Sequence, residues 1–349
     1  MRIVHLPVFR SNPYQYLLMQ AQRDLGHVVM DGHHHQGGPF LFEVWRRWKP
    51  QALHFHWLHP FMLDGERRFS LARTGRFLAE VALAKRAGWR IVWTIHNLVS
   101  HGGKFTLMEQ AFTRPFGHLA DACMAHSKAA SEEAQRTFRI PAHKMHVVPH
   151  GNYIGCYPNT IDRGQARARL GLPEGAFVYL FFGRILPYKG VFELVEAFAQ
   201  LPLQCRLVIA GNARDAVTTE RLQTAARQDS RIVVFPNHIP DEEIQVYFRT
   251  ADIAVFPYQR ILTSGSLILA QSFGTPVVAP EMGGCPEGVG TDSGWLFDPA
   301  QKDSLATTLK IALNDPELAA KAAASRKRAE AWPWAKVARE MNVLYGVPV

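Results

Sequence analysis

The chain has 349 residues, of which 47% are hydrophobic, and this is enough for two buried cores. It contains no apolar run of about 18 residues, and MRIVHLPVF turns polar at Arg10, so we expect a cytoplasmic protein, neither secreted nor membrane-spanning. The net charge of +9 is uneven. Residues 1–155 carry 19 Lys and Arg against 10 Asp and Glu, while residues 156–349 carry 20 of each. This asymmetry predicts that the first half meets an anionic surface, although a basic surface without a partner remains an alternative.

The first half alternates short apolar runs with helical patterns. A helix is expected from Pro13 to about Leu25, after a loop that contains Asn12. The alternation predicts a parallel sheet that is covered on both faces. Ligands of such sheets bind beyond the carboxyl ends of the strands, where His56, Trp57, His96 and Asn97 are expected. The predicted strands are 1–7, 27–30, 51–55, 89–95, 121–125 and 145–148.

A second alternation follows the segment PHGNYIGCYPN at 149–159, which is rich in Gly, Pro and Asn. The charge balance changes at the same place, so we put a domain boundary there. The fold class expected is α/β, with two doubly wound, Rossmann-like domains over residues 1–152 and 153–333. The strands predicted for the second domain are 177–182, 206–210, 232–235, 253–256, 276–278 and 295–297.

The segment FVYLFFGRILPYKGVFELVEAF at 177–198 reads as a buried strand, a basic loop and an amphipathic helix. Arg184 and Lys189 in that loop, beside a helix N-terminus, predict a site for a diphosphate. Downstream, Ser264, Gly265 and Ser266 read as a second helix N-terminus directed at the same anion. A βα turn with solvated Arg and Lys side chains is the alternative interpretation.

The order of motifs in the second half resembles the donor domain of the two-domain (GT-B) glycosyltransferases, in particular the large retaining family numbered four. The first half is similar to that family at TIHN (94–97) and HVVPHGN (146–152). The resemblance implies two domains facing across a cleft, a nucleotide sugar as donor, and a terminal helix (334–349) that crosses back onto the first domain. The motifs that carry it are GR (183–184), KG (189–190), GN (211–212), ADIAVFPY (251–258), SGS (264–266), FGTPVVAP (273–280), GGCPE (283–287) and GWLFDP (294–299).

One departure from the family is informative. Members usually carry two glutamates eight positions apart, whereas the corresponding stretch here, QRILTSGSLILAQS, has no carboxylate. Together with HFHW, TIHN and FGRILPYKG, this stretch is closer to the bacterial exopolysaccharide β-mannosyltransferases of the xanthan-assembly type. That likeness implies transfer of mannose from GDP-mannose, with inversion, onto a lipid-linked oligosaccharide at the inner face of the cell membrane.

The resemblance and the chemistry together assign roles. Positive charge near the leaving diphosphate would replace a metal, so neither a metal nor a cofactor is expected. An inverting reaction needs a base near the acceptor hydroxyl, for which His96 is the first candidate and Asp64 the second. Residues expected at the diphosphate are Arg184, Lys189, Ser264, Gly265 and Ser266. Those expected around the nucleotide and sugar are Gly183, Gly211, Asn212, Asn237, His238, Ile239, Tyr258 and Glu287. Those on the acceptor side are Asn12, Tyr14, His56, Trp57 and Asn97.

Two further clusters have competing interpretations. The histidines at 33–35 and at 54, 56 and 59 suggest zinc, but adjacent or alternating histidines do not give a closed tetrahedral site. The segments FEVWRRWK (42–49) and 67–86 mix basic and aromatic residues, which is typical of peripheral membrane contact. Ordinary solvated helices are the alternative for both segments.

Other functions remain open. Within the class, a retaining or UDP-sugar-dependent transferase is the alternative. A nucleotide-sugar epimerase would share the two-domain plan but leave the basic first half unexplained. A catalytically silent sugar-nucleotide binding subunit would explain the missing glutamates. Nucleic-acid binding is disfavoured, because no recognisable binding module accompanies the basic residues.

Overall fold

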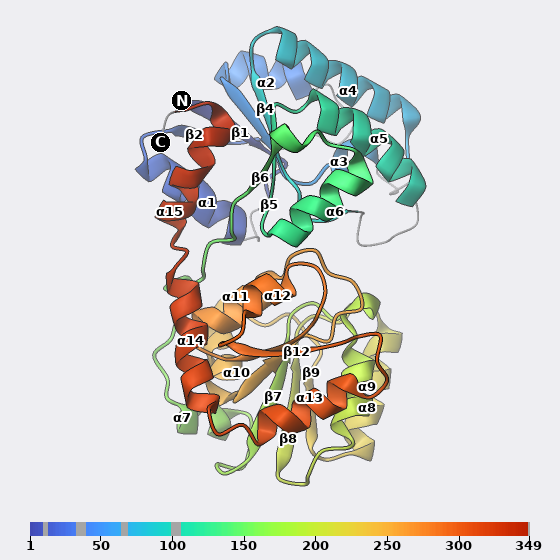
Figure 1. The fold of residues 1–349 in the computed structure, drawn as a ribbon, viewed down its shortest axis with the longest axis vertical. Coiled ribbons are helices and arrows are strands. Elements are labelled where there is room, and N and C mark those ends of the chain that lie inside the picture. Colours follow the sequence, from blue (N-terminus) through green and yellow to red (C-terminus); the bar gives the residue numbers. More distant parts are fainter. Residues whose placement is uncertain (10–12, 33–39, 64–68, 99–105, 348–349) are drawn as a thin grey trace. The chain divides into compact units, whose positions relative to one another are not determined.

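The computed structural model describes residues 1–9, 13–32, 40–63, 69–98 and 106–347 (Figure 1). The chain forms two compact units, and each is described by itself. Unit 1 comprises Met1–Gly151 together with Trp332–Val349, and unit 2 comprises Asn152–Ala331.

Unit 1 is built on a six-stranded sheet in the order β2-β1-β3-β4-β5-β6, and all its strand pairs are parallel. Its elements are β1 (Arg2–Leu6), α1 (Pro13–Asp24), β2 (Val28–Asp31), α2 (Phe40–Trp48), β3 (Ala52–Phe55), α3 (His59–Met62), α4 (Leu71–Arg86), β4 (Arg90–Thr94), α5 (Thr106–Leu119), β5 (Ala122–Ala125), α6 (Lys128–Phe138), the 3-10 helix η1 (Ala142–Lys144), β6 (Met145–Val147), α15 (Trp334–Glu340) and the 3-10 helix η4 (Met341–Tyr345).

Unit 2 repeats the plan with a parallel sheet in the order β12-β11-β10-β7-β8-β9. Its elements are α7 (Arg163–Arg169), β7 (Phe177–Phe182), the 3-10 helix η2 (Pro187–Lys189), α8 (Val191–Phe198), β8 (Cys205–Ala210), α9 (Ala216–Gln228), β9 (Ile232–Phe235), the 3-10 helix η3 (Asp241–Glu243), α10 (Ile244–Thr250), β10 (Ile253–Val255), α11 (Gly265–Ser272), β11 (Val277–Pro280), α12 (Cys285–Val289), β12 (Gly294–Phe297), α13 (Ser304–Leu313) and α14 (Leu318–Glu330).

The expected fold class is confirmed: two six-stranded parallel sheets, each surrounded by helices (Figure 1). Strands buried on both faces read as continuous apolar runs, which is why FVYLFF predicts β7 at the bounds that the structure gives it. No helix in the described part of the chain is long and apolar enough to cross a membrane.

The C-terminal segment completes the core of unit 1. Helix α15 packs against α1, and Val337, Met341 and Leu344 are fully buried in the cluster that contains β1 and β4 side chains. Gly151 permits this packing, because a β-carbon there would lie 2.4 Å from ring atoms of Trp334. The last residues of the chain therefore contribute side chains, Tyr345 among them, to the interior of unit 1.

Candidate active site

In unit 2, three of the predicted residues converge at the carboxyl end of β7. A β-carbon on Gly183 would lie 2.9 Å from Ser266 Oγ and 3.4 Å from Lys189 Nζ. Gly183 has φ +129°, a conformation that other residues rarely adopt. The glycine thus leaves an open space that is bordered by an ammonium group and a hydroxyl.

Lys189 is held in place by the turn around it. Gly190 has φ +68°, and a β-carbon there would lie only 1.8 Å from the carbonyl oxygen of Pro257. The Lys189 ammonium lies 5.6 Å from the centroid of the Tyr258 ring. Burial, and secondarily the charge of Arg184, lower the pKa of Lys189 to about 8. Neither cation is paired with a carboxylate in the described part of the chain, so the site has positive charge available for an anion.

Helix α11 supplies a second kind of anion contact. Ser264 caps the helix, because its Oγ accepts from the Leu267 N–H (3.1 Å) and lies 2.8 Å from Tyr258 Oη. The first N–H groups of a helix have no partner within the helix, so those of Gly265 and Ser266 can donate to a ligand. Burial raises the pKa of Tyr258 well above its usual range, which keeps this phenol neutral.

The remaining predicted residues of unit 2 lie around the same edge of the sheet. Gly211 has φ +138°, and a β-carbon there would lie 2.1 Å from Gly183 O, so β7 and β8 end in close contact. Asn212, Asn237 and His238 are exposed beyond β8 and β9, and Ile239 is buried. Glu287 is exposed in the first turn of α12.

The stretch without carboxylates contains one buried amide, Gln271. Its Nε2 donates to the Gly288 carbonyl (2.8 Å) and lies 3.3 Å from Ser293 Oγ. The Gln271 amide is therefore hydrogen-bonded to other residues of unit 2.

In unit 1, histidines occupy the carboxyl ends of five adjacent strands. They come from β1, from β3 and the residue after it, and from the segments that directly follow β4, β5 and β6. Because parallel strands end at one edge of the sheet, these imidazoles lie close together. The six residues are His5, His54, His56, His96, His126 and His150.

Three of these rings form a hydrogen-bonded row. His5 Nδ1 lies 2.8 Å from His56 Nε2, and His56 Nδ1 lies 3.1 Å from His96 Nε2. At the inner end of the row, His5 Nε2 lies 2.8 Å from Gln22 Oε1. At the outer end, Trp57 stacks on His96 with ring centroids 4.5 Å apart.

A second branch joins the same amide. Gln22 Nε2 donates to Tyr345 Oη (2.8 Å), which lies 2.6 Å from His54 Nδ1, and His54 Nε2 lies 2.7 Å from Thr94 Oγ1. One ring nitrogen from each of His5, His54 and His56 forms a set of three atoms within 4.8 Å of one another, a spacing compatible with a metal ion. All six ring nitrogens of these histidines have hydrogen-bond partners in the protein, however, so a metal would have to displace those bonds.

Burial keeps the cluster uncharged at neutral pH. It lowers the pKa of His5 and of His126 to about 4 and that of His150 to about 3. For His54, His56 and His96, burial and then the neighbouring histidines hold the pKa well below its usual value. Neutral imidazoles can accept protons, as a general base must.

His126 and Tyr14 extend the cluster. His126 Nδ1 donates to the carbonyl of Val148 (2.9 Å), and its buried Nε2 has no hydrogen-bond partner among the described residues. The ring of Tyr14 is in edge contact with His56, His96, His126 and His150. The predicted acceptor-side residues Tyr14, His56 and Trp57 are thus brought together with His96.

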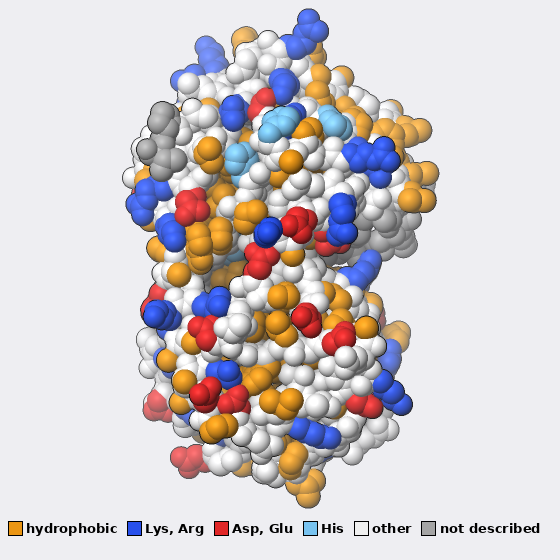
Figure 2. All heavy atoms as spheres, in the orientation of Figure 1, with side chains coloured by type: hydrophobic (Ala, Val, Ile, Leu, Met, Phe, Trp, Pro, Cys, Tyr) orange, Lys and Arg blue, Asp and Glu red, His pale blue; other side chains and the backbone are white. Residues whose placement is uncertain are grey.

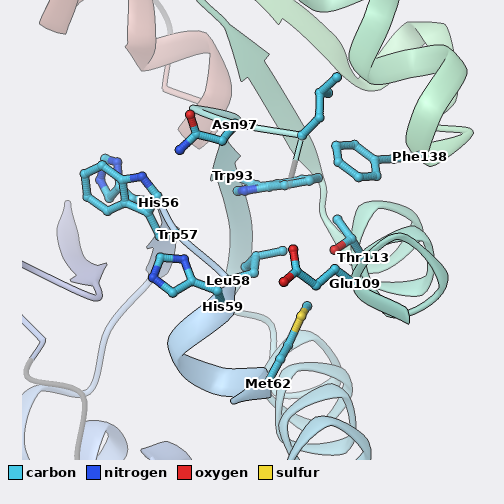
Figure 3. A pocket seen from close by; sticks show the side chains of 11 residues that line it. His56, Trp57, Leu58, His59, Met62, Trp93, Asn97, Glu109, Thr113 and Phe138 are labelled. Atoms are coloured by element: carbon cyan, nitrogen blue, oxygen red, sulfur yellow. The ribbon is translucent and has the colours of Figure 1, made fainter. Parts of the chain in front are cut away.

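A pocket lies beside this cluster, between α3, α5 and the ends of β3 and β4 (Figure 3). His56, Trp57 and Asn97, all expected on the acceptor side, line it together with His59 and Trp93. Figure 3 shows the Glu109 carboxylate extending from α5 into this pocket, and only 4% of Glu109 is exposed.

Sequence reasoning missed His5, His126, His150, Gln22, Tyr345 and Glu109. A signal for the histidines was available, because 15 of the 16 lie before residue 156. Asn12, Asp64 and the histidines at 33–35 lie outside the described residues.

Comparison with known proteins gives two family matches in chain order. Residues 31–152 match the family described as Glycosyltransferase Family 4, and residues 162–329 match Glycosyl transferases group 1. The D-inositol 3-phosphate glycosyltransferase of Streptomyces avermitilis is 30% identical over 228 residues, which are 62% of this chain and 49% of that protein. The enzyme of the same name from Xylanimonas cellulosilytica is 30% identical over 237 residues, covering 65% of this chain and 57% of that protein. The matches thus span about half the length of these curated relatives.

Solved structures share the fold over the whole chain. Sucrose-phosphate synthase from Thermosynechococcus elongatus superposes with a TM-score of 0.78 at 20% identity, covering 99% of this chain and 98% of the other. HepE from Anabaena, solved with UDP, gives a TM-score of 0.75 at 16% identity and covers 99% of both chains.

The two parallel sheets have the GT-B fold, and the two family matches, which follow each other along the chain, are both to glycosyltransferase families. The group 1 match covers residues 162–329, most of which lie in unit 2.

Proposed function

We propose that this protein transfers a hexose from a nucleotide sugar, bound by unit 2, to an acceptor bound by unit 1. The observation that carries the proposal is the grouping of Lys189, Gly183 and Ser266 at the end of β7, with no carboxylate paired to Lys189 among the described residues. This grouping lies within the segment matched to Glycosyl transferases group 1. HepE, which has the same fold, was solved with UDP.

The chemistry of the leaving group explains these residue types. Breaking the bond between a sugar and a nucleoside diphosphate leaves growing negative charge on the diphosphate. Lys189, Arg184 and the first N–H groups of α11 would stabilise this charge, and hydrogen bonds to charged groups contribute about 1.5–3 kcal/mol each. In this proposal they replace the divalent metal of metal-dependent transferases.

On the acceptor side, we assign the proton acceptor to His96. Its neutral ring, stacked on Trp57 at the end of β4, suits an inverting displacement in which the acceptor hydroxyl loses a proton. Asn97, Trp57 and His56 line the adjoining pocket and would contact the acceptor sugar. A retaining reaction of the same fold remains the alternative.

For the donor and acceptor we propose mannose from GDP-mannose and a lipid-linked oligosaccharide in surface polysaccharide assembly. The support is the likeness of HFHW, TIHN, FGRILPYKG and QRILTSGSLILAQS to enzymes of that type. A UDP-sugar is the second candidate, favoured by the UDP bound in HepE. A phosphorylated polyol acceptor is a further alternative, since the matched relatives are named for D-inositol 3-phosphate.

We also propose that unit 1 associates peripherally with an anionic membrane surface at the inner face of the cell membrane. Phe42 and Trp45 in α2 are 64% and 51% exposed, and Arg46 and Arg47 are exposed beside them. Figure 2 shows Lys and Arg side chains dispersed over the visible face of unit 1, with hydrophobic side chains between them. Aromatic and basic side chains on one helix are typical of an interfacial helix.

Vesicle sedimentation tests the membrane proposal. Replacing both Phe42→Ala and Trp45→Ala should weaken binding to vesicles of phosphatidylcholine and phosphatidylglycerol. Leu203→Ala in unit 2, which removes a side chain that is 81% exposed, is the control and should bind like the wild type. Equal binding by all three proteins would overturn the proposal.

A thermal-shift titration tests the donor site. A ligand that binds the native state raises the melting temperature by mass action, so the protein is titrated with GDP, UDP, ADP and their sugar conjugates. Stabilisation by GDP and GDP-mannose alone supports the mannose donor, and stabilisation by UDP species replaces it. No response to any nucleotide would contradict a nucleotide-sugar site.

A turnover assay distinguishes sugar transfer from two other functions. A nucleotide-sugar epimerase would convert the donor without an acceptor, and a silent binding subunit would bind the donor without converting it. Neither would release nucleoside diphosphate in an acceptor-dependent manner, which is the signature of transfer.

A further inference from the structure

The two branches of the histidine cluster meet at one side chain, Gln22 in α1. Gln22 is fully buried, and its amide presents the NH2 group to Tyr345 Oη and the oxygen to His5 Nε2, both at 2.8 Å. An amide oxygen only accepts hydrogen bonds, so the proton of neutral His5 lies on Nε2. Its Nδ1 is then an acceptor.

The position of the proton on His5 determines the tautomers of the next two rings in the row. A neutral imidazole has one donor and one acceptor nitrogen. His5 Nδ1 therefore accepts from His56 Nε2–H at 2.8 Å, which leaves His56 Nδ1 unprotonated. His56 Nδ1 in turn accepts from His96 Nε2–H at 3.1 Å. His96 Nδ1 is consequently left with a lone pair, and no described residue donates a hydrogen bond to it.

We infer that Gln22 sets the tautomers of His5, His56 and His96, so that His96 presents an unprotonated Nδ1 to the acceptor hydroxyl. The inference rests on the proposed transfer function and adds to it the reactive nitrogen and three positioning residues, Gln22, His5 and His56. The burial of all three is compatible with a fixed arrangement, because 1% or less of each is exposed.

The acceptor oxygen forms a bond to the anomeric carbon while the bond from that carbon to the diphosphate oxygen breaks, and the bonding electron pair leaves with the diphosphate. The hydroxyl proton passes to His96 Nδ1. The resulting imidazolium donates a charge-assisted hydrogen bond through Nε2 to His56, which is stronger than the neutral one that it replaces.

Control of tautomer has large consequences in catalysis. In a catalytic triad, loss of the residue that holds the histidine in its tautomer lowers kcat by about 10⁴-fold. In this protein the row formed by His56, His5 and Gln22 would fix the tautomer of the base, as the carboxylate does in a triad. Without the hydrogen bond to Gln22, the three rings would populate two arrangements, one with the protons on Nε2 and one with the protons on Nδ1. In the second arrangement His96 Nδ1 carries a proton and cannot act as a base.

The test is side-chain ¹⁵N NMR of histidine-labelled protein with the variants Gln22→Met and Gln22→Glu. We expect His5, His56 and His96 of the wild type to carry their protons on Nε2. Gln22→Met removes the acceptor, so the three rings should show mixed tautomers, and transfer at neutral pH should fall at least about tenfold. Gln22→Glu keeps an oxygen acceptor and should retain the Nε2–H tautomers.

Gln15→Met is the matched control, because Gln15 is also fully buried in α1 but bonds to Pro7 O and to the Phe9 N–H. This variant should leave the three tautomers unchanged, even if it lowers the melting temperature as much as Gln22→Met. Nδ1–H tautomers in the wild type, or unaltered tautomers in Gln22→Met, would overturn the inference.

The inference about the tautomers and the proposed function can be disproved independently of each other. The NMR signals need no nucleotide, so the tautomer result stands even if no nucleotide binds. A protein that transfers sugar but holds His96 as the Nδ1–H tautomer would retain the proposed function and lose this inference.

Discussion

The Lys189 ammonium lies 5.6 Å from the centroid of the Tyr258 ring, and among the described residues it is paired with no carboxylate. Partial burial and the charge of Arg184 disfavour the protonated form and lower the pKa of Lys189 to about 8. The negative charge of a diphosphate at this position would favour the ammonium form and raise the pKa of Lys189 again, so nucleotide binding and protonation of Lys189 are coupled.

The affinity for a nucleoside diphosphate should therefore fall as the pH rises through about 8. Below that value the ammonium is present before binding, and above it a proton must be taken up. We expect Kd to increase by about tenfold between pH 7 and pH 9, measured by isothermal titration calorimetry. Lys189→Arg keeps its charge throughout this range and should give a flat profile. A wild-type Kd that is independent of pH would remove Lys189 from the anion site.

Gly183→Ala should damage both stability and binding in unit 2. The new β-carbon would lie 2.9 Å from Ser266 Oγ on a residue with φ +129°, and such strain costs on the order of 1–3 kcal/mol. Urea unfolding measures the loss of stability, and nucleotide thermal shifts measure the loss of binding. Gly175→Ala is the control, because nothing lies within 4 Å of its β-carbon position. Equal stability of the two variants would contradict the close packing at Gly183.

His96→Gln should abolish most transfer while leaving nucleotide binding intact. General base catalysis contributes about 10²–10⁴-fold, and His96 belongs to unit 1, whereas the proposed diphosphate groups belong to unit 2. Initial transfer rates and nucleotide thermal shifts separate the two effects. His143→Gln, at an exposed position in η1, should behave like the wild type. A nearly normal rate for His96→Gln would assign the base to another residue.

Unit 1 should lose stability when the pH falls below about 6.5. His5, His126 and His150 have folded-state pKa values of about 4, 4 and 3, whereas an unfolded histidine titrates near 6.5. Between these values the unfolded state binds more protons, so the free energy of unfolding decreases with falling pH, by up to about 1.4 kcal/mol per pH unit for each histidine. Urea unfolding at pH 7 and pH 5 measures this slope.

Replacing His126 with Asn removes one of these titrating groups and should make the slope shallower. The comparison is made between slopes, so a uniform loss of stability in the variant does not affect it. If the free energy of unfolding of the wild type did not change between pH 7 and pH 5, the histidines would not be buried in their neutral form.

Much of the fold could be predicted because buried parallel strands read as apolar runs. The expected strands at 177–182 and 232–235 coincide with β7 and β9. The grouping of Gly183, Lys189 and Ser266 was also predictable, because strands β7 and β10 of one parallel sheet end at the same edge and their following loops meet there.

The histidine row was less accessible to sequence reasoning. Gln22 reads as an ordinary polar residue of a helix, and its partner Tyr345 is 323 residues away in the sequence. Glu109 likewise sits in an unremarkable helical pattern, TLMEQAFTR, and only tertiary packing buries it beside the pocket. Contacts between such distant positions depend on how α1, α5 and the C-terminal segment pack against the sheet.

The central claim is tested most directly by measuring release of nucleoside diphosphate from GDP-mannose and UDP-glucose in the presence of lipid-linked oligosaccharide acceptors. The wild type and the exposed-lysine control Lys302→Ala should turn over one donor in an acceptor-dependent manner. Lys189→Ala should be at least about a hundredfold slower, because a major contact to the leaving group is lost. Release by Lys189→Ala at the wild-type rate, or no acceptor-dependent release by the wild type, would contradict the account.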